Sequence, residues 1–195
     1  MKKIMFNDRY GLTQAVIGGR KTMTRRLIPD EFFGLTWDTR GDTLVYENEY
    51  GDFIDVRQSK YTRYKVGEVV AVAQRYQDIF DYSNCVNPYD WEDDDKPSGW
   101  TNKMFTKAEL MPHRIRITGI KCERLQDIQD ADCLKEGVRY IPEINKFYFE
   151  DVSREEGFYF DNHREAFAAL IDKVSGRGTW ASNPLVVAYE FELVK

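Results

Sequence analysis

The sequence predicts an α+β fold, with a small mixed β-sheet curled into a barrel and flanked by two or three helices. Segments with strand character outnumber those with helical character, and the two kinds do not alternate regularly along the chain. That order disfavours a parallel βαβ sheet. The chain has 195 residues, which predicts a single domain over 1–195 whose core needs no disulfide bonds.

The N-terminal segment predicts a strand, a helix and a second strand. An apolar strand is expected over 3–6. The side chain of Asn7 or Asp8 is expected to cap the following helix, because it can accept hydrogen bonds from free backbone N–H groups. A glycine pair that begins at Gly18 ends this helix. Residues 22–28 then have the pattern of a strand.

The next part of the chain predicts strands only. An insertion near 30–60 contains three strand-type segments, at 35–39, 43–47 and 53–57, which turn sequences separate. The segment 68–74 is apolar on both faces, a pattern typical of a central strand.

The C-terminal half predicts two long strands and two helices. Apolar residues alternate over 113–125, and a short helix is expected over 130–136. Asn162, followed by Glu165 three residues later, resembles a capping box at the start of an amphipathic helix. Alternation over 185–193 predicts the final strand.

Two further insertions interrupt this pattern. The segment near 77–112 is long, acidic and aromatic. The segment near 138–160 is expected to contain a hairpin at 146–150. Irregular segments of this length inside a compact domain are usually functional lids or mobile additions.

The charges are unevenly distributed. The formal net charge of −5 argues against a protein that coats nucleic acid. Residues 9–29 nevertheless contain no acidic side chain, and residues 76–95 contain no Lys or Arg. The sequence therefore predicts one basic surface and one acidic loop.

Several classes of protein are excluded by composition. No apolar run approaches the roughly 20 residues of a membrane helix, and no apolar stretch follows the N-terminal lysines as in a signal peptide. A cytoplasmic location is expected. The three cysteines form no CxxC pair and the two histidines lie far apart, so we expect no disulfide framework, no metal site and no cofactor.

The basic segment 19–26 reads GRKTMTRR and follows the first predicted helix directly. Its four cations and two hydroxyls suit a phosphate group, although a solvated basic turn has the same composition. Elsewhere, one aromatic residue can stack on a base, and two arginines on one strand face can extend a phosphate track. The candidate ligand-binding residues are Arg20, Arg25, Arg26, Tyr76, Arg114 and Arg116.

The same segment carries a family resemblance. Gly19, Lys21, Thr24 and Arg26 match the GxKxxTxR signature of the ASCH domain, a member of the PUA-like superfamily. Three later blocks also resemble that family, the last of them its phage and prophage branch; they lie at 66–73, 130–137 and 179–191. The resemblance implies a PUA-like barrel with a cleft lined by the GxKxxTxR loop.

The resemblance also implies chemistry on RNA or nucleotide derivatives. Some ASCH domains hydrolyse the acetyl amide of N4-acetylcytidine with a Lys, a Thr and a Glu, others act as ribonucleases, and many have no known activity. Lys21 and Thr24 occupy the first two positions, and Gln74 occupies the position expected for the Glu. Glutamine carries no charge and cannot act as a base near neutral pH.

We therefore expect a basic cleft that binds RNA, single-stranded nucleic acid or a modified nucleotide, with Lys21, Thr24 and Gln74 lining one concave site. Two alternatives remain open. One is a hydrolase, either an N4-acetylcytidine-type amidohydrolase or a ribonuclease, with those three residues as its candidate catalytic set. The other is a phage assembly or interaction protein without catalysis.

Overall fold

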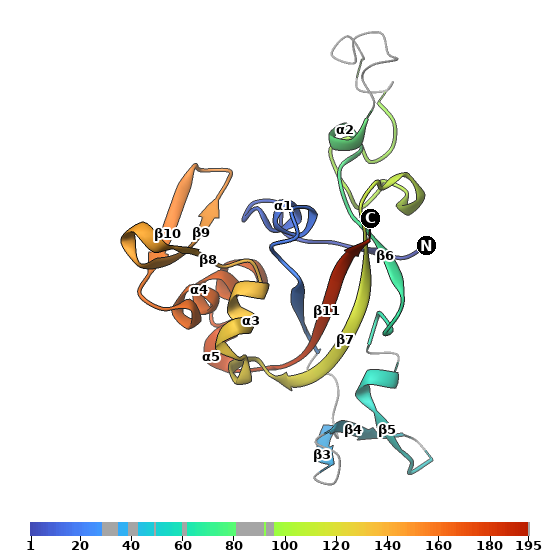
Figure 1. Ribbon diagram of the computed structural model, residues 1–195. Helices are drawn as coiled ribbons and strands as arrows, with labels where there is room; N and C mark the ends of the chain where they lie inside the picture. Colours follow the sequence, from blue (N-terminus) through green and yellow to red (C-terminus); the bar gives the residue numbers. More distant parts are fainter. Residues whose placement is uncertain are drawn as a thin grey trace.

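The computed structural model describes residues 1–28, 35–38, 43–48, 50–59, 62–80, 92 and 96–194. Within these residues the chain forms a five-stranded mixed sheet, two three-stranded sheets and five helices (Figure 1). This arrangement confirms the predicted α+β class.

The main sheet gathers strands from both ends of the chain. Its first two strands run parallel, and the other neighbours are antiparallel. Its order is β1 (Lys3–Ile4), β6 (Val69–Val72), β7 (Arg114–Arg124), β11 (Leu185–Val194) and β2 (Met23–Leu27).

The predicted closed barrel is absent from the described residues. β1 and β2 are the two edges of the sheet and do not pair with each other. β1 contains only two residues, so it offers few backbone groups for closure. The sheet is nevertheless strongly curved (Figure 1). A register shift between Glu190 and Phe191 of β11 contributes to this bend, as bulges do.

Five helices flank the sheets in the described part of the chain: α1 (Leu12–Ile17), α2 (Tyr76–Ile79), α3 (Asp130–Lys135), α4 (His163–Ser175) and α5 (Thr179–Ser182). The cap predicted for α4 is confirmed, because Asn162 Oδ1 accepts a hydrogen bond from the Glu165 N–H at 2.8 Å. The cap predicted for α1 is wrong. Its N-cap is Gly11, at a φ of 63°, because residues 8–11 form an extra turn before the helix starts.

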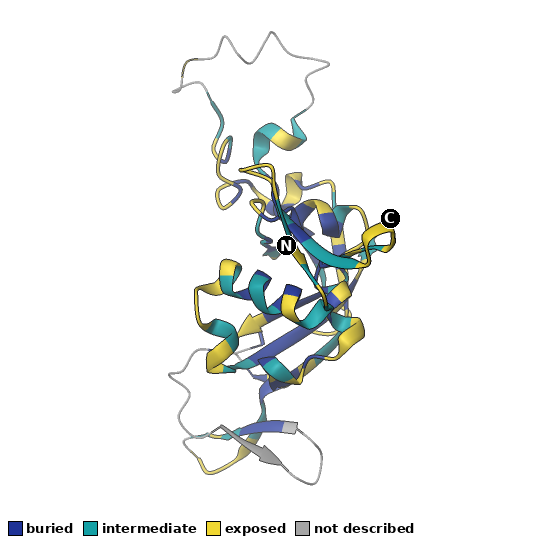
Figure 2. Ribbon diagram, turned by 90° about the vertical axis from the view of Figure 1, so that its left-hand side faces the viewer, coloured by how far each residue is buried: buried dark blue, intermediate teal, exposed yellow. Residues whose placement is uncertain are grey.

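The core lies between the curved sheet and α4. Ile115 and Ile117, two alternate residues of β7, are fully buried, and β11 is buried at four consecutive residues that end at Tyr189. Phe167 and Leu170 of α4 pack into the same cluster. Figure 2 shows the buried strands in dark blue beside the half-buried helix. The predicted alternation is therefore confirmed in the first part of β7, whereas β11 is buried on both faces from Val186 to Tyr189.

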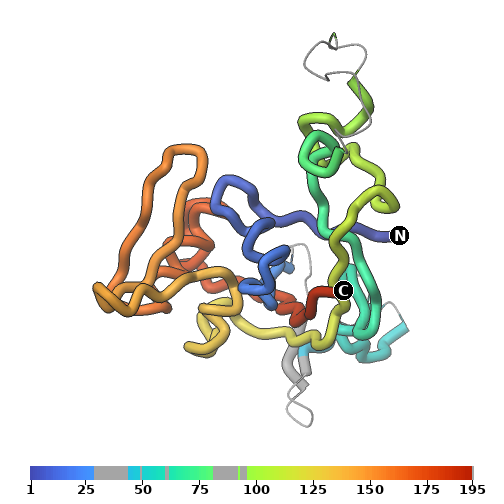
Figure 3. The backbone as a smooth tube through the Cα atoms, turned by 45° about the horizontal axis from the view of Figure 1, so that its top comes forward, coloured from blue at the N-terminus to red at the C-terminus, as the bar shows by residue number. Residues whose placement is uncertain are grey.

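Two of the three predicted insertions form small sheets of their own. The insertion near 30–60 holds β3 (Leu35–Asp38), β4 (Thr43–Glu47) and β5 (Phe53–Asp55), close to the predicted bounds. The insertion near 138–160 holds β8 (Arg139–Ile141), β9 (Lys146–Asp151) and β10 (Glu156–Phe160). A hairpin is present in this insertion, but residues 146–150, where it was predicted, all belong to β9; the turn follows Asp151, and β9 and β10 extend away from the main sheet (Figure 3).

The third insertion, near 77–112, is described only in part. The segment predicted to be an acidic loop falls largely on 81–91 and 93–95, outside the described residues. Its second half is anchored to the N-terminal strand: Lys3 Nζ donates hydrogen bonds to the backbone carbonyl oxygens of Lys103 and Thr106, at 3.0 and 2.7 Å. None of the described helices has the length and apolar character required to cross a membrane.

Candidate ligand pocket

A pocket of about 270 Å³ lies between the edge strand β2, helix α4 and the segment that follows β1. Most of its polar lining comes from β2, from the residues just before β2 and from the end of α3. Half of its apolar lining comes from α4. The polar residues are Asn7, Lys21, Thr24, Arg25, Arg26, Glu136 and Ser175; the apolar residues are Met5, Phe6, Leu12, Leu27, Phe167, Leu170, Ile171 and Val174.

Two glycines allow the chain to bring this lining together. Gly19 follows α1 at a φ of 72°, where side chains other than glycine are strained. The backbone N–H groups of Arg20 and Lys21 then donate to the Ala15 carbonyl oxygen at 2.8 and 2.9 Å. Gly137, at a φ of 110°, follows Glu136, and a Cβ atom there would lie 3.0 Å from Leu12.

Lys21 and Glu136 form a buried ion pair inside the pocket. Lys21 Nζ donates to Glu136 Oε2 at 2.6 Å and to the Glu136 carbonyl oxygen at 2.7 Å. The two residues are only 2% and 5% exposed. Burial lowers the pKa of Lys21 below its ordinary value, and the neighbouring carboxylate of Glu136 opposes that shift. Perturbed amines of this kind are more frequent at functional sites than elsewhere.

Arg25 holds Glu136 from the other side. Its Nη1 donates to Glu136 Oε1 at 3.0 Å, so the two oxygens of this carboxylate are bound by two different cations. The same guanidinium donates to Glu123 Oε1 at 2.7 and 2.9 Å and lies 3.3 Å from Asp132. Arg25, which the sequence suggested as a ligand contact, therefore positions Glu136 and has three acidic partners inside the protein.

The other face of β2 presents Thr24 and Arg26 to the pocket. Thr24 pairs with the buried Tyr189 of β11 and, within the described residues, makes no side-chain hydrogen bond. Arg26 is exposed and donates to the Met5 carbonyl oxygen. The ring centroid of Phe6 lies 5.8 Å from Arg26 Cζ and 5.9 Å from Lys21 Nζ, so two cations flank this ring.

Gln74, the third residue expected in the site, does not line the pocket. It follows β6, and its backbone N–H contacts Met111 Sδ at 3.3 Å. Gln74 is buried, and its Oε1 has no hydrogen-bond partner among the described residues. The structure therefore brings Lys21 and Thr24 to one pocket, and Gln74 is not part of that pocket.

The remaining candidate residues lie elsewhere. Tyr76 packs edge-on against Trp100 and Phe80, in a small aromatic cluster beside α2. Arg114 and Arg116 are exposed on the outer face of β7, opposite the core. Arg20 is also exposed, close to the sheet formed by β8–β10, and it does not line the pocket.

Glu136 is the site residue that the sequence analysis missed. It directly follows α3, within the block 130–137 that the sequence analysis singled out, so a signal was present. The pattern gave no reason to place it against Lys21, because 115 positions separate the two residues.

Comparisons of the chain with models of known protein families, with curated proteins and with solved structures found no match. Within the described ranges, no group of three or more His, Cys, Asp or Glu side chains is arranged to hold a metal ion.

Proposed function

We propose that the chain is an ASCH-type protein of PUA-like fold, and that the pocket beside β2 binds a nucleotide or a modified nucleoside. One observation carries the proposal: Lys21, Thr24 and Arg26 of the GxKxxTxR motif all line the same pocket. A solvated basic turn gives no reason for such convergence, nor for the burial of Lys21 in an ion pair.

The size and lining of the pocket favour a small ligand. Its volume of about 270 Å³ lies just below the usual range for ligand pockets, so a single nucleoside unit fits better than a length of polymer. Leu27, which is 43% exposed, and the part-buried Val174 offer apolar surface to a base, and Thr24 offers a hydroxyl to its polar edge. Arg26 is the exposed cation suited to a phosphate.

Binding is tested by titration calorimetry with cytidine 5′-monophosphate and cytidine at low and high salt. Wild type is expected to bind the nucleotide more tightly than the nucleoside. Rising salt is expected to weaken binding of the nucleotide, because it screens the attraction between the phosphate and Arg26. Arg26→Gln should remove most of the difference between the two ligands. The matched control is Arg114→Gln, which removes an exposed arginine on the outer face of β7. Absence of binding by both ligands contradicts the proposal.

Hydrolysis of an acylated nucleoside is the second candidate, and Glu136 is the observation that favours it. From the sequence alone no carboxylate could be assigned to the site of Lys21 and Thr24, because Gln74 occupies the position expected for the Glu. Glu136 contacts Lys21 Nζ at 2.6 Å and lines the same pocket as Thr24. A hydroxyl, an amine and a carboxylate are therefore present together.

Such a set can cleave an acyl amide in two steps. Thr24 Oγ1 attacks the carbonyl carbon while neutral Lys21 Nζ takes the hydroxyl proton. The C–N bond then breaks, and the amine leaves with that proton. Water hydrolyses the resulting threonyl ester and releases the acid. Lys21 becomes this base when its own proton passes to Glu136 across the 2.6 Å hydrogen bond. Burial, which lowers the pKa of Lys21, favours that transfer, whereas the negative charge of Glu136 opposes it.

A chromatographic assay for cytidine released from N4-acetylcytidine tests this second candidate. Wild type is expected to release cytidine, and Thr24→Val to abolish the release while it leaves the fold intact. Gln74→Glu should give no increase, because residue 74 does not line the pocket. Nucleotide binding by a wild type that releases no cytidine contradicts hydrolysis and leaves the binding function standing.

A further inference from the structure

The outer face of the β8–β10 sheet carries a pair of parallel tyrosine rings. Tyr148 of β9 and Tyr159 of β10 are cross-strand partners, and their ring centroids lie 5.7 Å apart with an interplanar angle of 17°. Tyr159 is 56% exposed and Tyr148 is half-buried. The opposite face of the same sheet packs against α4 with its phenylalanines, so these tyrosines do not serve that core.

Gly157 leaves room for Tyr159 to lie over the sheet. A Cβ atom at position 157 would come within 2.9 Å of Cε2 and Oη of Tyr159. Gly157 does not have a positive φ, so its backbone would accept another residue. A side chain there would instead collide with the Tyr159 ring. The Tyr159 ring therefore lies close to the strand at Gly157, and with 56% of the residue exposed it stays open to solvent.

Two arginines lie beside these rings. Arg139 of β8 is the cross-strand neighbour of Tyr148; its Cζ lies 5.5 Å from the ring centroid, and its Nη1 donates to Tyr148 Oη at 2.7 Å. Arg139 also pairs with Glu150 at 3.0 Å. Arg20 is exposed and forms no ion pair within the described residues. Partial burial, and then the positive charge of Arg139, lower the pKa of Arg20, whereas Tyr148 and Glu150 oppose the shift; Arg20 is therefore close enough to these three residues to interact with them.

We propose that the face formed by Tyr148, Tyr159, Arg139 and Arg20 binds single-stranded nucleic acid, with bases stacking on the tyrosine rings and phosphates contacting the arginines. Exposed aromatic rings next to cations are the two elements that sequence-tolerant recognition of single strands requires. The opposite charge of the phosphates complements the arginines, whereas a neutral apolar partner would leave Arg20 unpaired.

The inference rests on the proposed function and extends it. Arg20 immediately precedes Lys21, so one short segment borders the tyrosine face and lines the pocket. A strand held on the tyrosine face can present one of its nucleotides to the pocket. The proposed substrate class is therefore a nucleotide within a single strand. The pocket holds that one nucleotide, and the tyrosine face holds its neighbours in the strand.

The test is fluorescence anisotropy with labelled 10-nucleotide strands of RNA and of DNA, together with calorimetry on cytidine 5′-monophosphate. Tyr159→Ala is expected to weaken binding of the strand by about 10-fold, the effect typical for loss of one stacked base. Tyr159→Phe keeps the ring and should bind as wild type does. Gly157→Ala should weaken binding as well, because the added Cβ displaces the Tyr159 ring. All three variants should leave the affinity for the mononucleotide unchanged.

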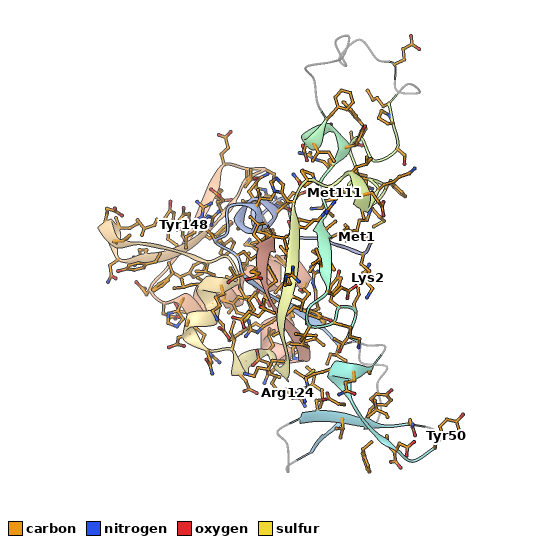
Figure 4. All side chains as sticks on the ribbon, turned by 45° about the vertical axis from the view of Figure 1, so that its right-hand side comes forward. Met1, Lys2, Tyr50, Met111, Arg124 and Tyr148 are labelled. Atoms are coloured by element: carbon orange, nitrogen blue, oxygen red, sulfur yellow. The ribbon has the colours of Figure 1, made fainter. Side chains whose placement is uncertain are left out.

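Tyr50→Ala is the matched control, since Tyr50 is 81% exposed on the β4–β5 turn, far from Tyr148 (Figure 4). If wild type binds the mononucleotide but binds neither the RNA nor the DNA strand more tightly than the mononucleotide, the inference is overturned and the proposed function stays intact. Strand binding that Tyr159→Ala does not change overturns it too. Loss of all nucleotide binding in wild type contradicts the proposed function itself.

Discussion

Lys21 Nζ lies 2.6 Å from Glu136 Oε2, joining the loop after α1 to the end of α3 across 115 positions of sequence. The pair is almost fully buried, and Arg25 takes the second oxygen of the same carboxylate. Removal of one member of a buried pair leaves the other charge without compensation, and this costs more than loss of an exposed pair.

Glu136→Gln is therefore expected to lower the free energy of unfolding by about 3–5 kcal/mol, because both Lys21 and Arg25 lose a charged partner. The comparison is Glu192→Gln, in which an exposed carboxylate 3.8 Å from Arg116 is neutralised. That change should cost no more than about 1 kcal/mol. Urea unfolding of both variants measures the difference, and equal effects would show that the buried pair adds nothing.

Phe167→Ala should be strongly destabilising. Phe167 is 1% exposed, and its ring packs edge-on against Trp180 with centroids 6.0 Å apart. Truncation of a buried phenylalanine typically costs about 3–5 kcal/mol. Urea unfolding gives the value, and Phe105→Ala serves as the control because Phe105 is 61% exposed. A loss below about 1 kcal/mol at Phe167 would contradict the described packing of α4.

The contribution of Asp151 is expected to depend on pH. The hydrogen bond from Arg9, at 2.8 Å, is the main cause that lowers the pKa of Asp151 from 3.8 to about 2. The native state therefore binds fewer protons than the unfolded chain between these values. The stabilisation is fully present above pH about 4 and is lost as the pH falls through about 2.

Thermal unfolding of wild type and Asp151→Asn from pH 6 to pH 2.5 measures this dependence. The difference in Tm should shrink as the pH falls. Asp161→Asn is the control, since Asp161 is an exposed carboxylate paired with Lys146. A difference for Asp151→Asn that stays constant over the whole range would show that the Arg9 contact does not hold the carboxylate ionised.

Lys103→Met tests whether the insertion near 77–112 supports the pocket. The buried Nζ of Lys103 donates to the Phe6 carbonyl oxygen and, at 2.7 Å, to Asp8 Oδ1. Phe6 lines the pocket. Loss of these bonds should cost about 1–3 kcal/mol of unfolding free energy and weaken binding of cytidine 5′-monophosphate. Lys107→Met, at an exposed position, should change neither quantity.

Local patterns in the sequence predicted most elements of the fold. Alternating apolar residues predicted both β7 and β11, although burial alternates only in the first part of β7. The Asn162 cap located the start of α4 because it acts within three residues. The cap of α1 was mispredicted because Asn7 and Asp8 lie before an extra turn that ends at Gly11. A residue with a capping side chain, such as Asp8, can therefore lie several residues before the first turn of the helix.

The site was only partly predictable, because it depends on contacts between distant segments. Lys21 and Thr24 share one short motif, so the sequence could place them together. Glu136 reaches Lys21 only after α3 docks behind β2, and no local pattern encodes that docking. The ion pairs of Arg25 were invisible for the same reason, since Glu123 lies on β7 and Asp132 on α3.

A crystal structure of the protein soaked with cytidine 5′-monophosphate tests the central claim most directly. We predict that the nucleotide lies between β2 and α4, with its phosphate within hydrogen-bond distance of Arg26 and its base against Leu27 and Val174. A saturating soak that leaves this pocket without nucleotide, or that places the nucleotide on the outer face of β7 beside Arg114, would contradict the account.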